Sequence, residues 1–184
     1  MRIFADTFQV AEAPAQLVTQ LIADLDDFVH LRRHVFGCVF SQRVLTDRGG
    51  FARAVIGAPA QVTAKPHERQ FVEWAYANLF RQQLGGELPD FVIFFDISLW
   101  QRDNPEEREQ LVYHELCHVQ QRKDEYGAPR FEKDGRPMLR IAAHDVEVFH
   151  AELKRYGDVV PVFDETAISL ATGARRRRPG RRVA

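Results

Sequence analysis

The residues with the clearest chemical potential are His114-Glu115-Leu116-Cys117-His118. Histidines four positions apart lie on the same face of a helix, so both imidazoles can reach one metal ion. Zinc held by protein nitrogens with an open position lowers the pKa of its water to about 7. The carboxylate of Glu115 lies beside that stripe, where it can accept a proton from the water. This His-Glu-x-x-His spacing is short, so its context must support a metal site.

The residues before the motif signal the start of a helix. Asn104 is a favourable N-cap, Pro105 suits the first helical position, and Glu107 completes a pattern like a capping box. Acidic residues at the start and basic residues at the end suit the helix dipole. We therefore predict a helix from Pro105 to about Arg122, with the motif near its middle.

A catalytic zinc needs a third protein ligand. The candidates lie in a second predicted helix that ends near Tyr156-Gly157, after a polar loop or hairpin over residues 124–140. Glu147 is the main rival to His144, because zinc also accepts carboxylates. Asp145 could instead orient a metal-bound imidazole or favour the helix N-terminus. The candidates are His144, Asp145, Glu147 and His150.

Three segments together resemble a known family, the phage metallopeptidase domain. They are Asp90-Phe91-Val92-Ile93, residues 112–118, and His144-Asp145-Val146-Glu147-Val148-Phe149. The resemblance is strongest over about residues 89–157, and the family is zincin-like and related in outline to SprT-like metalloproteases. It implies His114, His118 and His144 as zinc ligands and Glu115 as the catalytic base.

Three upstream histidines sit among charged neighbours without metal-ligand spacing. We predict His30, His34 and His67 at the surface, and His150 facing solvent or a neighbouring turn. Cys117 is predicted to be a small core residue rather than a ligand. Cys38 and Cys117 do not make a disulfide framework, so a reducing compartment is the simpler expectation.

The upstream chain predicts a scaffold for the motif helix. Apolar stripes of helical period predict helices over residues 14–28 and 66–84, the latter with Phe71, Trp74, Ala75 and Leu79 inward. Strands are predicted over residues 35–44 and 51–56, joined by a hairpin turn at 46–50, and from Phe91 through Trp100. We expect an α+β, zincin-like fold: a small, mostly antiparallel sheet, the active-site helix packed on it, and a second helix carrying the third ligand.

The chain is predicted to hold one domain over residues 1–163 and a basic tail over residues 164–184. Removing the tail's six arginines and two acids from 25 basic and 26 acidic residues leaves 19 and 24, a net charge of −5. Such a tail can bind DNA phosphates through counterion release, or remain a disordered, solvated end. The arginines are Arg175, Arg176, Arg177, Arg178, Arg181 and Arg182.

These patterns predict a zinc metallopeptidase that hydrolyses a polypeptide substrate with one catalytic Zn²⁺ and with Glu115 as general base. The alternative is a nucleic-acid-associated protein with a structural metal site and an arginine-rich binding tail. No signal peptide and no membrane span are visible, so we expect a cytoplasmic protein, in the host cytoplasm if a phage encodes it.

Overall fold

A computed structural model of the chain describes residues 8–42, 45–47, 50–52, 54–57, 66–82, 84–85, 87–142 and 150–156. The chain divides into two units, residues 1–142 and residues 143–184. The sheet and the His114–His118 motif belong to the first unit. Within the described part of the second unit there is one helix, α5 (His150–Tyr156).

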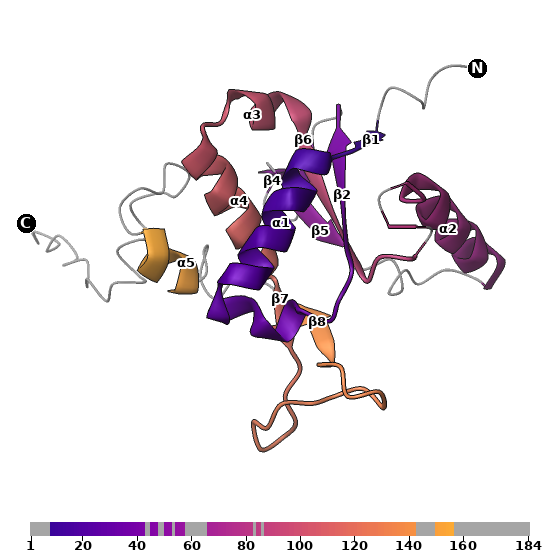
Figure 1. Cartoon of the computed structure of the whole chain (residues 1–184), viewed down its shortest axis with the longest axis vertical. Helices are drawn as coiled ribbons and strands as arrows, with labels where there is room; N and C mark the ends of the chain where they lie inside the picture. The colour runs from indigo at the N-terminus through magenta and orange to yellow at the C-terminus, as the bar shows by residue number, and fades with distance from the viewer. Residues whose placement is uncertain are drawn as a thin grey trace, which may run out of the picture. The chain divides into compact units, whose positions relative to one another are not determined.

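The first unit is built on a four-stranded sheet with the order β1-β2-β6-β5 (Figure 1). The outer strands pair antiparallel to their neighbours, whereas β2 and β6 are parallel. The predicted α+β class is therefore confirmed, with a mixed sheet whose central pair is parallel. The strands are β1 (Phe8–Val10), β2 (Phe36–Ser41), β5 (Ala54–Gly57) and β6 (Phe91–Asp96).

Residues on either side of the predicted turn at 46–50 form a separate small ribbon, in which β3 (Leu45–Asp47) pairs antiparallel with β4 (Gly50–Ala52). These strands are shorter than the predicted ones, and residues 48–49 between them lie outside the described residues. The two longer strands that flank this ribbon, β2 and β5, do not pair with each other. They lie on opposite sides of β6.

Helices supply the rest of the first unit's core. Helix α1 packs against β2 and against α4, and α4 also contacts β5. The buried residues Val18, Leu21 and Ile22 recur at helical spacing along α1, as its apolar stripe predicts. The helical segments are α1 (Glu12–Asp24), the 3₁₀ segment η1 (Asp26–Leu31), α2 (Pro66–Leu79), α3 (Ile97–Arg102) and α4 (Pro105–Cys117).

Two predictions about these elements were wrong. The strand expected to run from Phe91 through Trp100 ends at Asp96, because the Asp96 carboxylate accepts hydrogen bonds from the Ser98 and Leu99 amides (2.9 and 3.1 Å) and caps α3. Trp74 and Leu79 were expected to face inward on α2, yet they are 62% and 37% exposed.

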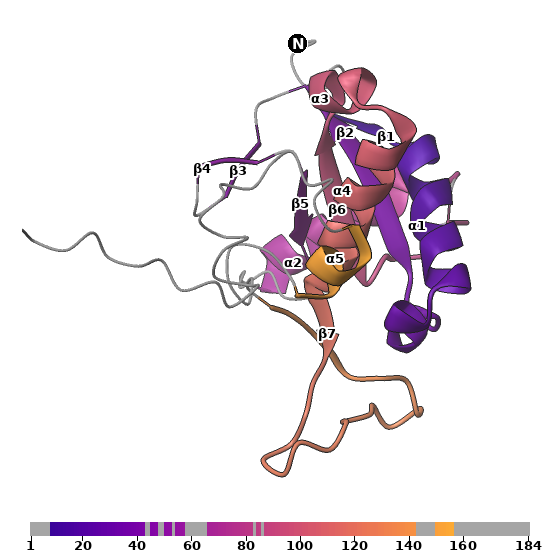
Figure 2. The ribbon, with the colours of Figure 1, turned by 90° about the vertical axis from the view of Figure 1, so that its left-hand side faces the viewer.

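The predicted loop or hairpin after the motif is a hairpin that extends away from the sheet (Figure 2). Its base is the antiparallel pair β7 (Val119–Gln121) and β8 (Leu139–Ile141). Between these strands the chain turns twice at glycines with positive φ, Gly127 (84°) and Gly135 (79°). The pairing of β7 with β8 sets the register of the two strands at the base of the hairpin.

Candidate metal centre

Helix α4 carries the motif, and its start is fixed by local hydrogen bonds. The Asn104 side chain accepts from the Glu107 amide, and the Glu107 carboxylate accepts from the Asn104 amide, both at 2.9 Å. With Pro105 in the first turn, this is the capping box that the sequence predicts. The beginning of α4 is thus set by residues within one turn.

The end of α4 differs from the prediction, which extended the helix to about Arg122. The helix ends at Cys117, and His118 is its C-cap with φ −65° and ψ −23°. Val119, only 1% exposed, leaves the helix and pairs with Ile141 in β7–β8. Strand pairing over this distance in sequence overrides helix propensity. The motif therefore lies at the end of the helix rather than near its middle.

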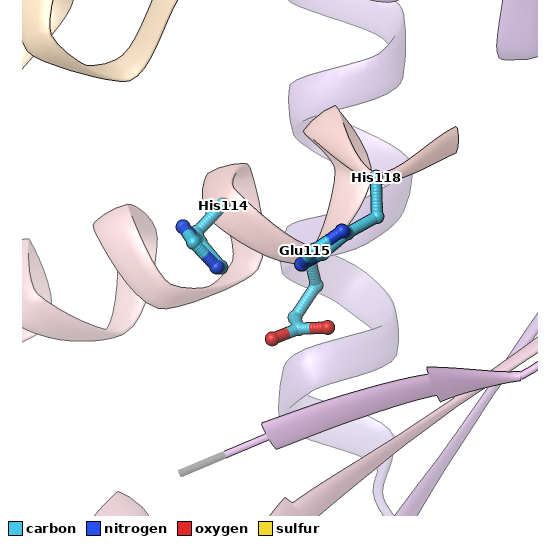
Figure 3. A group of neighbouring side chains, drawn as sticks. All are labelled: His114, Glu115 and His118. Atoms are coloured by element: carbon cyan, nitrogen blue, oxygen red, sulfur yellow. The ribbon is translucent and has the colours of Figure 1, made fainter. Parts of the chain in front are cut away.

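His114, Glu115 and His118 form one group whose potential ligand atoms all lie within 4.8 Å of one another. Figure 3 shows the Glu115 carboxylate on the same side of α4 as the two imidazoles. Two nitrogens bound to zinc at about 2.0–2.1 Å would be roughly 3–4 Å apart, so small side-chain rotations bring this group to ligand geometry. The histidines are half-buried, whereas Glu115 is only 4% exposed.

The orientation of His118 is defined by the end of the hairpin. Its Nδ1 lies 2.8 Å from the carbonyl oxygen of Ala142, and the Ala142 amide donates to the His118 carbonyl at 2.7 Å. A carbonyl only accepts hydrogen bonds, so Nδ1 carries the proton and the ring's lone pair is on Nε2. Metal-bound histidines are commonly oriented in this way by a backbone carbonyl. The donor set and this tautomer fit a zinc ion.

The proposed third-ligand residues lie outside the described residues. These are His144, Asp145 and Glu147; His150 begins α5, but nothing is described of its side chain or of that of His67. The arginine tail, residues 175–182, also lies outside them. The alternative of a nucleic-acid-binding tail therefore gains no support from the part of the chain that the structure describes.

The prediction that His30 and His34 lie at the surface was wrong. His30 is half-buried, and its Nε2 lies 2.8 Å from the carbonyl oxygen of Val119. The His34 side chain is 7% exposed, with Nε2 3.0 Å from the Pro137 carbonyl oxygen. Both contacts join the η1 region to the hairpin. Their partners are 89 and 103 positions away, so no local pattern could have indicated them.

A charged cluster accompanies the His34 contact. The Asp90 carboxylate lies 3.3 Å from His34 Nδ1 and 3.8 Å from an Arg136 nitrogen, and accepts from the Val35 amide at 2.9 Å. Burial acts to raise the pKa of Asp90, but hydrogen bonds from His34 and Val35 and the nearby positive charges outweigh it and hold that pKa below its usual value. The ionised carboxylate is thus favoured where the chain before β6 meets the hairpin.

The two cysteines have different surroundings. Cys38 is fully buried in β2, and burial raises the pKa of its thiol to about 12. Cys117 was predicted to be a core residue and is half-buried; it is not part of the His114, Glu115 and His118 group. Among the helices described here, none is long and apolar enough to cross a membrane.

One of three comparisons with known proteins found a match. No curated protein and no solved structure matched the chain. A family model described as "Putative phage metallopeptidase" matches residues 6–170, a range that contains the motif and His144 and ends before the arginine run. The chain therefore belongs to this family of phage metallopeptidases.

Proposed function

We propose that the protein is a zinc-dependent peptidase that hydrolyses peptide bonds, with Glu115 as its general base. The observation that carries the proposal is the convergence of His114, Glu115 and His118 on one side of α4, with His118 oriented by Ala142. Membership of a metallopeptidase family supports a peptidase at the level of reaction class. The mechanism and the zinc are our inference from the site.

The metal and the protein would have different roles in the reaction. A bound zinc would act as a Lewis acid, polarising the carbonyl of the scissile bond and lowering the pKa of the attacking water to about 7. Glu115 then accepts the proton of the attacking water and delivers it to the leaving amine. The Glu115 carboxylate is nearly completely buried, so water screens its interaction with the two imidazoles only weakly.

We propose His144 as the third ligand. Ala142 is hydrogen-bonded to His118 through both its carbonyl and its amide. His144 follows Ala142 by two residues, so chain length alone keeps their Cα atoms within about 7 Å. Glu147 remains the alternative ligand, with a longer connection to the same anchor. Asp145 is proposed to orient a bound imidazole or to favour the start of the following helix.

The proposed reaction implies that the substrate is a polypeptide, and we propose that it binds in an extended conformation. Strand β5 is an edge of the four-stranded sheet and contacts α4. An edge strand offers main-chain donors and acceptors that can pair with an extended chain. We propose that β5 aligns the substrate beside the metal-binding helix.

The decisive experiment compares Glu115→Gln with Glu106→Gln, which makes the same change at an exposed position of the same helix. Zinc content is measured by native mass spectrometry, and turnover is measured with a library of quenched fluorescent peptides. We expect Glu115→Gln to keep zinc and to lose roughly 10²–10⁴-fold in turnover, the usual contribution of a general base. Glu106→Gln should match the wild type. Wild-type turnover in Glu115→Gln would refute the mechanism.

The ligand assignments are tested by zinc affinity alone. His114→Ala and His118→Ala should each abolish tight zinc binding, and His144→Ala should weaken it strongly. If Glu147→Ala weakens zinc binding and His144→Ala does not, Glu147 is the third ligand. That result would change the ligand set and leave the proposed reaction in place.

A further inference from the structure

The 3₁₀ segment η1 makes two side-chain hydrogen bonds that end on either side of the metal-binding motif. One reaches Tyr113, the residue before His114, and the other reaches Val119, the residue after His118. These two contacts are called the η1 tethers below. Their positions suggest that η1 acts on the geometry of the motif.

The first tether joins Tyr113 to Asp27. The Tyr113 hydroxyl donates to the Asp27 carboxylate at 2.8 Å. Tyr113 is fully buried, and its ring packs against Phe28 of η1 with ring centroids 4.9 Å apart. A buried phenol is costly without a polar partner, and hydrogen bonds to an ionised acceptor are stronger than neutral ones. This contact therefore fixes the helical turn that presents His114.

The second tether joins His30 to β7. The His30 Nε2 lies 2.8 Å from the Val119 carbonyl oxygen, so it is the donor in this contact. Val119 is the first residue of β7 and is 1% exposed. Together with the Ala142 contacts to His118, this holds the chain on both sides of the helix end.

The tethers matter because His118 occupies a weak position in the helix. It is the C-cap of α4, and helix ends fray because their last carbonyl groups lack helical partners. Segment η1 is itself well anchored: Phe28 and Leu31 are buried, and the Arg32 guanidinium that follows donates to the carbonyls of Ile22 and Ala23 at 3.3 and 3.0 Å. The tethers thus connect the end of α4, which is prone to fray and carries His118, to the well-anchored segment η1.

We propose that Asp27 and His30 are positioning residues that hold the imidazoles of His114 and His118 at the separation a metal ion requires. Neither residue belongs to the group that can contact the metal, so both act through the backbone of α4 and β7. This inference rests on the proposed metal site. Loss of a tether should lower metal affinity by about 10-fold or more, the effect typical of groups that orient metal ligands.

The test uses pairs of variants that remove or retain each contact. His30→Ala removes the second donor, whereas His30→Gln keeps an N–H that can reach Val119 and should restore part of the affinity. Asp27→Ala removes the first acceptor, and Asp27→Asn keeps an oxygen acceptor and should restore part of it. Asp26→Ala and Val29→Ala are matched controls, because both residues are exposed on the same segment and are not part of either tether.

Metal affinity is measured with Zn²⁺ against a chromophoric chelator, and site geometry with the visible spectrum of bound Co²⁺. We expect about 10-fold weaker Zn²⁺ binding and an altered Co²⁺ spectrum in the two tether-removing alanine variants, with the controls within twofold of the wild type. Tyr113→Phe should match Asp27→Ala, and the double variant should be no weaker than either alone. Wild-type affinity in His30→Ala and Asp27→Ala would overturn the proposal.

A second measurement separates this inference from the metal hypothesis. If the wild type binds no Zn²⁺, the proposed function fails, and the tethers are judged by amide hydrogen exchange in the metal-free protein. We expect His30→Ala to speed exchange in residues 115–121 at least several-fold while exchange in α1 stays unchanged. Unchanged exchange at the end of α4 would overturn the tether proposal independently of any metal.

Discussion

Gly37 lies in β2 beneath the ring of Phe80, so replacing it with alanine should destabilise the protein. A Cβ at Gly37 would lie 2.5 Å from Phe80 Cζ and 2.8 Å from both Cε atoms, where 3.4–4 Å is ordinary contact. Phe80 is fully buried and belongs to a core cluster with Val39 and Val92. The ring therefore has to move by about 1 Å within a close-packed core.

Gly57 provides a matched control. Gly37 and Gly57 pair with the same residue, Val92, from opposite sides of β6. A Cβ at Gly57 would meet nothing within 4 Å. Replacing a strand glycine by alanine without a clash should stabilise by about 0.5–1 kcal/mol. At Gly37 this gain is opposed by an overpacking cost of about 1–3 kcal/mol, so the two variants should differ by roughly that cost.

The assay is urea unfolding at 25 °C, followed by tryptophan fluorescence, with thermal midpoints as a second measure. A difference of about 2 kcal/mol corresponds to about 4–8 °C in Tm for a chain of this size. A Gly37→Ala variant as stable as Gly57→Ala would refute the reasoning. A Phe80→Leu background removes the end of the ring, so the Gly37→Ala penalty should shrink there.

Two further predictions concern ionisable groups. Because the pKa of Asp90 is lowered in the folded state, its carboxylate stabilises the fold above the unfolded value of 3.8, and this contribution is lost as the pH falls through the folded pKa. Asp90→Asn should therefore lower the urea midpoint at about pH 6 and have little effect at about pH 2; an equal penalty at both pH values would contradict this account. With a thiol pKa of about 12 in a fully buried site, Cys38 should resist iodoacetamide at about pH 8 until the protein unfolds, as peptide mass mapping would show; labelling of Cys38 in the native protein would contradict its burial.

The sequence predictions were accurate where the determining residues lie close together in the sequence, and they failed where those residues lie far apart. The start of α4 was predicted because Asn104, Pro105 and Glu107 encode it within one turn, and the His114 and His118 spacing needs only helical geometry. The end of α4 was missed because Val119 is drawn into β7 by Ile141, on the far side of the hairpin. Local propensity carries no information about such a partner.

The supporting contacts of the site were missed for the same reason. His30 and His34 have no unusual sequence neighbours, and their carbonyl partners come from the hairpin. The position of β6 between β2 and β5 is also a long-range property, since apolar runs predict strands and not their order. The proposed ligand His144 lies outside the described residues, so its assignment stays a prediction.

The central position of β6 has a consequence for how the chain is made. Strand β6 lies between β2 and β5 in the sheet but follows both of them in the sequence. Val35 and Asp90, which precede the parallel strands β2 and β6, are 55 positions apart. A nascent chain that has emerged only as far as β5 therefore has two strand edges without their shared partner. Such edges favour association with other chains. Because α3 and α4 follow β6 in the chain, the sheet and α4 are completed only after β2 and β5 have both emerged, and the interval before β6 emerges is when these two edges are exposed to aggregation.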